Sequence, residues 1–399
     1  MVTAAATTDV PDTKLTESPC FRRLALGNWR NFRSTDVELT ERVFLIGPNA
    51  SGKSNLLDVF RFLGRLSAPG GGLQQAVAER GGMSSLRSLG APRDADISVE
   101  VELETVDGGG LWTYRLVFNE ERDQTNGGAV VVREETVRRD GETLLSRPDE
   151  NDRADPARLS QTHLEQVFAN QAFREIAEHF RSIRYLHLIP QLIRDPDRFR
   201  ERANDPFGSD LLEQIARPPE QELSRRMEQI QQALKVAIPR LELLEIYRDA
   251  GGAPHLRARY REARENTWQS ERDFSDGTLR LLGLLWALLD GKGPLLLEEP
   301  ELSLQSRIVR EIPQMFAMMQ LKNDRQVIVS THSEELLADE GIRPDEVLLL
   351  LPEEPGTAIR KPTDFPVIVD LLRSGMPLAE AVSPYIAAPE PRNLALSVR

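Results

Sequence analysis

The sequence predicts an α/β fold, and three observations lead to this prediction. A glycine-rich phosphate-binding loop at residues 47–54 stands between an apolar strand and a helix. Two further apolar segments, at residues 295–300 and 326–333, end in polar residues, as parallel strands do where they meet a site. Alternating segments between residues 96 and 137 predict an antiparallel meander beside that sheet.

The phosphate-binding loop has the pattern G-x-x-x-x-G-K-S. Gly47 and Gly52 let the backbone turn tightly, so that successive N–H groups point at phosphates. Lys53 brings a positive charge to the terminal phosphates, and the Ser54 hydroxyl is a ligand for Mg²⁺. The strand at residues 42–46 and the helix that follows favour this interpretation over an ordinary glycine-rich turn. The residues expected to bind the nucleotide here are Gly47, Pro48, Asn49, Ala50, Ser51, Gly52, Lys53, Ser54 and Asn55.

Composition narrows the class of protein. The chain has 399 residues and a net charge of −13, which argues against non-specific coating of nucleic acid. A single cysteine, Cys20, excludes an internal disulfide and a cysteine-rich metal site. The first 19 residues lack the apolar core of a signal peptide, and the longest apolar stretch, 279–289, is too short to span a bilayer. We therefore expect a soluble, cytoplasmic protein with no membrane partner.

The other elements follow from periodicity and turn residues. Alternating segments predict strands at 21–26 and 34–39, and Asp-Gly and Asn-Gly pairs at 107–108, 126–127 and 140–141 predict the meander turns. A charged, proline-containing stretch at 146–158 indicates a linker. Amphipathic spacing predicts helices at 161–180 and 219–237, and strand character returns at 241–247 and 256–261.

The carboxyl half offers chemistry that completes a nucleotide site. The strand at residues 295–297 ends in two acids, and the first, Glu298, can hold Mg²⁺ while the second, Glu299, deprotonates a water molecule. His332 follows another apolar strand and is placed to contact the γ-phosphate. The alternatives are a solvated glutamate pair and a surface or capping histidine.

A helix start between the meander and the acid pair predicts a second anion site. Ser275 or Asp276 caps the helix, and Gly277, followed by Thr278, permits a close approach of the backbone. The partial positive charge of the helix N-terminus would attract a phosphate. The alternative is a helix cap with no ligand.

The order of these motifs resembles the ABC-type ATPases of the RecF/SMC-like branch, and in particular a bacterial "AAA family ATPase" group related to the OLD-family ATPases. The opening L-G-N-W-R-N-F-R, from Leu26 to Arg33, strengthens the resemblance. The resemblance implies that residues 47–54 are Walker A, that Glu298 is the Walker B acid and Glu299 the general base, with Lys53 catalytic. It implies that 300–304 is the D-loop, that His332 is the switch histidine, and that 275–278 are the signature motif. In this family the signature reaches the partner's γ-phosphate across a homodimer that encloses ATP and Mg²⁺.

The resemblance gives a full expected architecture: an ABC-ATPase-type P-loop NTPase head with an antiparallel β-meander lobe and a helical insertion. Glu298 stands where relatives have Asp, and no clear Q-loop glutamine is present, with Gln74 and Gln75 the nearest candidates. The expected segments are a disordered tail (1–19), an N-terminal ATPase lobe (20–145), a helical insertion (146–240), a C-terminal ATPase lobe (241–352) and a C-terminal extension (353–399).

Two functions remain open at this stage. OLD-family nucleases carry a Toprim domain after the ATPase core; the residues given after His332 contain no Asp-x-Asp metal pair, so we expect no nuclease site in them. The first function is therefore an ATP-hydrolysing dimeric switch that regulates a separate effector protein, such as a nuclease in phage defence. The alternative is a RecF-like repair ATPase that binds DNA. The arginines that would contact DNA, or form ion pairs with neighbouring acids, are Arg194, Arg198, Arg200, Arg202, Arg257, Arg259, Arg261 and Arg264.

Overall fold

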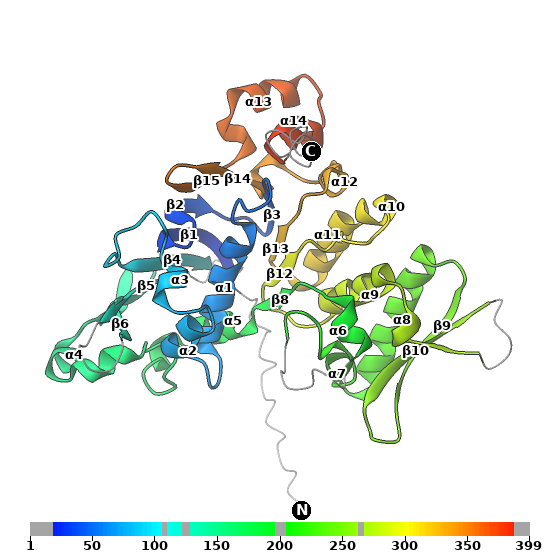
Figure 1. Cartoon of the computed structure of the whole chain (residues 1–399), viewed down its shortest axis with the longest axis horizontal. Coiled ribbons are helices and arrows are strands. Elements are labelled where there is room, and N and C mark those ends of the chain that lie inside the picture. The colour runs from blue at the N-terminus through cyan, green and yellow to red at the C-terminus, as the bar shows by residue number, and fades with distance from the viewer. Residues whose placement is uncertain (1–18, 106–109, 122–127, 196–204, 262–266, 387–399) are drawn as a thin grey trace, which may run out of the picture.

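A six-stranded central sheet organises the molecule (Figure 1). The structure, a computed structural model, describes residues 19–105, 110–121, 128–195, 205–261 and 267–386. Five strands of the sheet are parallel and the last, β15, runs antiparallel at one edge. In spatial order the strands are β15 (Gly356–Arg360), β14 (Val347–Glu353), β3 (Arg42–Ile46), β13 (Val327–Ser330), β12 (Leu295–Glu298) and β8 (Arg184–Leu186).

Both faces of the central sheet are buried, which explains why its strands are almost wholly apolar. Alternate side chains of β3 enter different cores: Val43 and Leu45 pack on the side of α1 (Lys53–Ser67), and Phe44 packs on the side of α11 (Ile312–Asn323). The helix α5 (Arg174–Ser182) lies beside α1. The predicted α/β fold is confirmed.

The predicted meander forms a second, antiparallel sheet of six strands, which Figure 1 shows on the side of α1. Asp140 and Gly141 both have positive φ and form a two-residue turn between β6 and β7. The turns predicted at 107–108 and 126–127 lie outside the described residues. In spatial order the strands are β2 (Phe32–Glu38), β1 (Cys20–Trp29), β4 (Ile97–Glu104), β5 (Leu111–Glu121), β6 (Ala129–Arg139) and β7 (Glu142–Arg147).

A third unit lies on the opposite side of the central sheet (Figure 1). It contains a three-stranded antiparallel sheet with helices that share one apolar core with α9 (Asp276–Leu289). The helix predicted at 219–237 is confirmed as α8, and the two predicted strands are confirmed as β9 and β10. The remaining elements of this unit are α6 (Pro190–Arg194), α7 (Leu211–Ile215), α8 (Glu220–Ala237), β9 (Leu241–Arg248), β10 (Pro254–Tyr260) and β11 (Gln269–Ser270).

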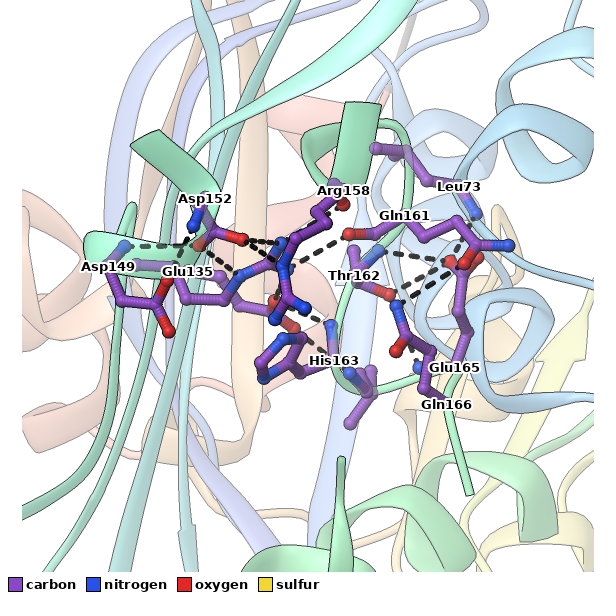
Figure 2. Close-up of polar contacts among 12 residues, drawn as sticks. Leu73, Glu135, Asp149, Asp152, Arg158, Gln161, Thr162, His163, Glu165 and Gln166 are labelled. Atoms are coloured by element: carbon purple, nitrogen blue, oxygen red, sulfur yellow. Dashed lines mark hydrogen bonds and ion pairs between the residues drawn. The ribbon is translucent and has the colours of Figure 1, made fainter. Parts of the chain in front are cut away.

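The linker predicted at 146–158 is wrong, because two of its charged residues, Arg147 and Asp152, are buried in the fold. Arg147 ion-pairs with Glu135 at 3.0 Å and with Asp152 at 2.8 Å, and none of these three side chains is exposed to solvent. Figure 2 shows the network, in which Arg158 also reaches Asp152. Mutual pairing satisfies charges that would be costly to bury alone. The short helix α4 (Glu150–Ala154) and a 3₁₀ turn at Pro156–Ser160 therefore pack against β6.

The helix predicted at 161–180 is also wrong over its first half. Regular α-helix begins only at Arg174. Before it, Thr162 and Glu165 bond to each other, and the Glu165 carboxylate accepts from the backbone N–H of Leu73, so that the segment forms turns tied to α2 (Leu73–Ala78). Side chains that bond locally or to a distant backbone compete with helix formation.

The division of the chain into five segments stays a proposal, and the structure adds detail to it. The segment 146–240 contributes β8 to the central sheet, and 353–399 contributes β15. The helices α13 (Pro366–Arg373) and α14 (Leu378–Ile386) follow and pack near α12 (Glu334–Leu337). All of the tail expected at 1–19 except Pro19 lies outside the described residues. In the described parts of the chain, no helix combines the length and apolar content that a bilayer crossing requires.

Candidate nucleotide-binding site

The motifs predicted from sequence meet at the carboxyl ends of β3, β12 and β13. The Ser54 hydroxyl, in the first turn of α1, donates a hydrogen bond to the Glu298 carboxylate at the end of β12. His332, after β13, lies with its ring Nε2 3.2 Å from Oε1 of Glu299. Parallel strands place their carboxyl ends at one edge of the sheet, which is where such folds bind ligands. Segments 244 residues apart in the chain therefore share one site.

The side chain of Lys53 folds back onto the backbone of the phosphate loop. The Nζ of Lys53 donates to the carbonyl oxygens of Gly47, at 2.9 Å, and of Pro48, at 3.1 Å. Burial lowers the pKa of Lys53 to about 8, and the nearby carboxylates, Glu299 first, act in the opposite direction. A bound phosphate would also favour the charged ammonium. The environment of Lys53 therefore suits an anionic ligand.

Two residues outside the loop brace its backbone. Asn31 Nδ2 and Thr357 Oγ1 both donate to the carbonyl oxygen of Ser51, at 3.0 and 2.9 Å. Gly52 has φ +101°, and a Cβ added there would lie 2.0 Å from Asn31 Nδ2, so only glycine fits. Asn55, predicted to bind nucleotide, donates instead to Asn31 Oδ1 at 2.7 Å. No sequence pattern points to Thr357, whereas Asn31 lies in the opening stretch, Leu26 to Arg33, that supports the resemblance.

Ser54 and Glu298 form an oxygen-ligand pair that fits Mg²⁺. Both supply hard oxygen donors, and they are in direct contact. Tyr185, on β8, donates its hydroxyl to the other oxygen of Glu298, an orienting contact that the motifs did not predict. The described residues contain no cluster of three or more metal-binding acids, histidines or cysteines. Such a site suits Mg²⁺, which keeps waters and phosphate oxygens as ligands.

The loop also contains a buried hydroxyl oxygen, that of Ser51, without a hydrogen-bond partner among the described residues. Ser51 is fully buried, and its Oγ makes no hydrogen bond with any described residue. Buried hydroxyls nearly always have a partner, so the orphaned Oγ fits a loop shaped for a ligand. Of the remaining loop residues, Pro48 is half-buried, whereas Asn49 and Ala50 are exposed, and Ala50 has φ +62°.

Glu299 is held in an unusual backbone conformation, with φ +45°. Its N–H donates to Ser330 O at 2.9 Å, and the hydrogen bond with His332 lowers the pKa of its carboxyl. A lowered pKa keeps the group ionised, as a proton acceptor requires. Non-glycine residues with positive φ gather at functional sites, where surrounding contacts hold them.

Glu301 positions His332 through its backbone, a role that the sequence did not predict. Its Oε1 accepts from Thr331 Oγ1 at 2.6 Å and from the His332 backbone N–H at 3.2 Å. Burial raises the pKa of Glu301, and its Oε2 has no hydrogen-bond partner among the described residues. The D-loop glutamate therefore ties the end of β13 to the loop that follows β12.

The predicted signature motif forms the tip of α9. Ser275 is the N-cap, and its Oγ accepts from the Thr278 backbone N–H at 3.2 Å. A Cβ added to Gly277 would lie 2.5 Å from the carbonyl oxygen of Ser303, so glycine allows the tip to contact the D-loop. Asp276 pairs with Arg194 at 2.6 Å. Ser275 is exposed, and no hydrogen bond in the described chain joins it to the phosphate loop.

Two further basic residues near Glu299, Arg280 and His187, were not predicted. Arg280, one turn into α9, has a buried Nε without a hydrogen-bond partner in the described chain. Burial lowers its pKa, while the charges of Asp276, Glu299 and Glu301 oppose that shift, so Arg280 stands between the helix tip and the acids. His187 follows β8, and its charge contributes to the lowered pKa of Glu299.

Other residues considered from sequence have structural partners. Gln74 donates to the carbonyl oxygens of Val130 and Ser160, and Gln75 bonds to Glu79, so neither reaches the nucleotide site. Among the arginines considered for DNA contact, Arg257 and Arg259 pair with Glu245 and Glu242 on the neighbouring strand. Arg198, Arg200, Arg202 and Arg264 lie outside the described residues.

Comparisons with known proteins agree with this geometry. The family described as "AAA domain, putative AbiEii toxin, Type IV TA system" matches residues 42–338, which is more than half of the chain. The DNA replication and repair protein RecF of Clavibacter sepedonicus is 32% identical over 115 residues. That match spans 28% of this chain and only 25% of the RecF chain.

A solved structure shares the fold. The SMC head bound to the C-terminal winged-helix domain of ScpA aligns with a TM-score of 0.50 at 14% identity, covering 86% of this chain and 98% of that one. The P-loop ATPase head and the RecF/SMC-like resemblance expected from sequence are therefore confirmed. The chain belongs to the AAA-domain family that includes putative AbiEii toxins of type IV toxin–antitoxin systems.

Proposed function

We propose that this chain binds and hydrolyses ATP as a head-to-head homodimer and acts as a switch for a separate effector protein. One observation carries the proposal: Lys53, Ser54 and Glu298 lie together with Glu299 and His332, while the Ser275 tip stays exposed. In such a site the phosphate loop of one subunit and the helix tip of its partner would enclose one ATP between them. Mg²⁺ held by Ser54 and Glu298 would neutralise charge on the phosphates.

Each of the chain's own site residues would then have a separate role in binding and hydrolysing ATP. Backbone N–H groups of residues 47–54 and the Lys53 ammonium bind the phosphates. Glu299 accepts a proton from the attacking water, and His332 orients that carboxylate and donates toward the γ-phosphate. The partner's α9 N-terminus adds a positive dipole end to the same phosphate. Hydrolysis would remove the group that joins the two subunits, so the dimer would open after each turnover.

Mixing two inactive variants tests the composite site. Ser275→Arg blocks the helix tip and leaves the phosphate loop intact, whereas Lys53→Ala disables the loop and leaves the tip intact. Neither variant should hydrolyse ATP alone. A mixed dimer pairs one intact loop with one intact tip, so mixing should restore up to about half of the wild-type rate per dimer. Ser374→Arg, at an exposed position after α13, is the matched control and should be fully active.

Recovery on mixing would require that the two motifs act across subunits. If mixing restores no activity although both variants are folded and Ser275→Arg still binds ATP, the composite site is wrong. Glu299→Gln should bind ATP without hydrolysing it and elute as a dimer in size-exclusion chromatography, and a monomer under these conditions would oppose the sandwich.

A groove between α8 and α11 suits the effector. Its floor contains Leu285 and Met315, and at its rim Val236 and Met318 are 84% and 57% exposed. Lys292, Arg307 and Lys322 line the same groove, and they form no ion pair with any described residue. An acidic amphipathic helix would complement both the apolar floor and the unpaired cations. Val236→Glu with Met318→Glu should abolish effector regulation and leave ATP turnover unchanged.

DNA repair remains the second candidate, and the partial match to RecF supports it. The pairing of Arg257 and Arg259 with acids leaves fewer cations free for phosphates. DNA binding that requires ATP and weakens steeply with salt would favour this candidate. Effector control that is insensitive to added DNA would favour the switch, including its proposed use in phage defence.

A further inference from the structure

A cavity of about 850 Å³ lies beside the edge strand β8, and none of the candidate site residues predicted from sequence lines it. Its walls come from α1, α5, β8, α7 and α9, and from the loop at residues 205–208. Small-molecule sites enclose roughly 300–1,000 Å³, so the cavity has the volume for a ligand of nucleotide size.

The lining of this cavity is rich in arginine, although the chain as a whole is acidic. Its acids are Glu79, Asp205 and Asp290. Its arginines are Arg61, Arg65, Arg80, Arg181, Arg184 and Arg325. Positive side chains gathered in a hollow focus the field and attract anions.

Some of these arginines are neutralised within the protein. Arg65 pairs with Glu79 at 2.8 Å, and Arg80 pairs with Asp58 at 2.9 Å. By contrast, Arg181 and Arg184 form no ion pair with any described residue, and the hydrogen bond of Arg181 goes to the Ser67 backbone carbonyl. The cavity therefore keeps arginines that no direct ion pair within the described residues neutralises.

Arg325 lines the deepest part of the cavity, because its side chain is almost fully buried. The residue is 1% exposed, and its Nε and Nη1 donate to the carbonyl oxygens of Gly293, Ala287 and Asp290. Its Nη2 has no hydrogen-bond partner in the described chain. Burial lowers the pKa of Arg325 to about 10; the charge of Asp290 opposes this shift and the charge of Arg184 adds to it. A buried guanidinium that forms no direct ion pair and leaves one nitrogen without an acceptor is costly, and an anion would relieve that cost.

The rest of the wall suits the organic part of such a ligand. Tyr185, Phe207 and Trp286 line the cavity. The indole Nε1 of Trp286 is buried and unpartnered within the described residues, so it is a second donor without an acceptor. Aromatic faces stack on nucleobases, and buried donors take phosphate or carbonyl oxygens.

We propose that this cavity is a second anion site, which binds a phosphorylated small molecule of nucleotide size. Arg181 and Arg184 would hold its phosphates, with Arg325 deeper in the wall. A nucleic acid fits less well, because Arg325 is buried beyond the reach of a duplex backbone, whose phosphates lie on a wide outer surface.

The cavity shares one residue with the candidate magnesium site. The guanidinium of Arg61 lies 4.3 Å from the centre of the Tyr185 ring, in the cavity wall. The hydroxyl of the same tyrosine donates to Glu298. A ligand that moves Arg61 would therefore change the support of Glu298, so occupancy of the cavity should alter ATP turnover.

The test is isothermal titration calorimetry with sodium tripolyphosphate on the full chain carrying Lys53→Ala, which weakens the competing phosphate loop. Adding Arg181→Gln and Arg184→Gln should weaken binding by about tenfold or more, since charge-assisted hydrogen bonds to phosphate are lost. The matched control adds Arg343→Gln and Arg373→Gln, which removes the same charge from exposed arginines outside the cavity. Affinity in the control should stay within about twofold.

A second ligand identifies the source of the phosphate. Tighter binding of ADP than of tripolyphosphate, lost with the cavity arginines, supports a nucleotide, and equal binding supports a polyphosphate group alone. The proposal fails if both variant pairs bind equally, or if tripolyphosphate does not bind at millimolar concentration. It also fails if single-stranded oligothymidylate displaces tripolyphosphate through the same arginines. Arg61→Gln provides a further cavity variant should the double variant unfold.

Discussion

His332 and Glu299 are joined at 3.2 Å between Nε2 and Oε1, and the backbone of the histidine is anchored on Glu301. Two acids therefore hold one imidazole, the first by its ring and the second by its main chain. A shift of the carboxyl end of β13 would therefore move His332 and, through it, the carboxylate of Glu299, which is expected to accept the proton.

The His332–Glu299 contact predicts a pH dependence of ATP turnover. The hydrogen bond from His332 lowers the pKa of Glu299, so the basic form persists as the pH falls. In His332→Ala that pKa returns toward its ordinary value near 4.3, and the acid limb of the pH–rate profile should move to higher pH. His163→Ala is the control, because His163 enters its network through its backbone N–H. An unmoved acid limb would exclude Glu299 as the group that titrates.

Gly277→Ala should separate ATP binding from hydrolysis. The new Cβ would meet the Ser303 carbonyl at 2.5 Å, so either the α9 tip or the D-loop must shift. We expect ATP affinity within about twofold of wild type and turnover lowered by about 10²-fold, since a small displacement of a catalytic group has large kinetic effects. Gly251→Ala, in an exposed turn, should leave both unchanged. Normal turnover by Gly277→Ala would mean that this contact is dispensable.

Thr357→Val should weaken nucleotide binding from outside the phosphate loop. The change removes the hydroxyl that donates to Ser51 O and accepts from Asn31. The loss of a buried hydrogen bond costs about 1–2 kcal/mol, which corresponds to a five- to thirtyfold rise in the dissociation constant if the loop alone bears it. Fluorescence titration with a labelled ATP analogue measures the effect, and Thr143→Val on exposed β7 is the control. Equal affinities for the two variants would show that the loop needs no brace.

Arg147→Met should destabilise the protein without touching the nucleotide site. The substitution leaves Glu135 and Asp152 buried without their cation, which costs about 3–5 kcal/mol. Urea unfolding measures this difference. Arg373→Met breaks only an exposed contact of 3.7 Å and should cost less than about 1 kcal/mol. Similar midpoints for the two variants would contradict the importance of the buried network in Figure 2.

The surroundings of His255, on β10 of the third unit, predict that the stability of the protein depends on pH. Its Nδ1 lies 2.7 Å from Glu271, and Asp249 is 3.5 Å from its other nitrogen, so these acids, Glu271 first, raise the pKa of His255. A raised pKa adds stability below about pH 6.5, and this stability is lost as the pH rises through the folded-state value. The melting temperature lost on His255→Gln should therefore be larger at pH 6 than at pH 8.5. A loss that is independent of pH would argue against protonation.

The phosphate loop and its strand could be predicted because local signals agree: an apolar strand, fixed glycines and a helix start within some twenty residues. The same agreement located Ser275, Glu298 and His332, each at the end of an element. The roles of these residues stay predictions, whereas the α/β head that positions them is confirmed.

The supporting residues could not be predicted, because their partners are distant in the chain. Tyr185 lies on a three-residue strand that carries no periodic signal, and only pairing with β12 brings it to Glu298. The charged, proline-containing stretch at 146–158 predicts a linker, since a charged sequence looks the same whether its charges face water or one another; in the structure Arg147 is buried in an ion-pair network.

The brace between Thr357 and Ser51 joins positions 306 residues apart. During synthesis the loop leaves the ribosome long before its support exists, because chains emerge from the N-terminus. A nascent fragment would bind nucleotide weakly. Full affinity would be reached only when β15, the edge strand that carries Thr357, joins the central sheet. Nucleotide binding would therefore depend on completion of the central sheet, because Thr357 on β15 supports the loop.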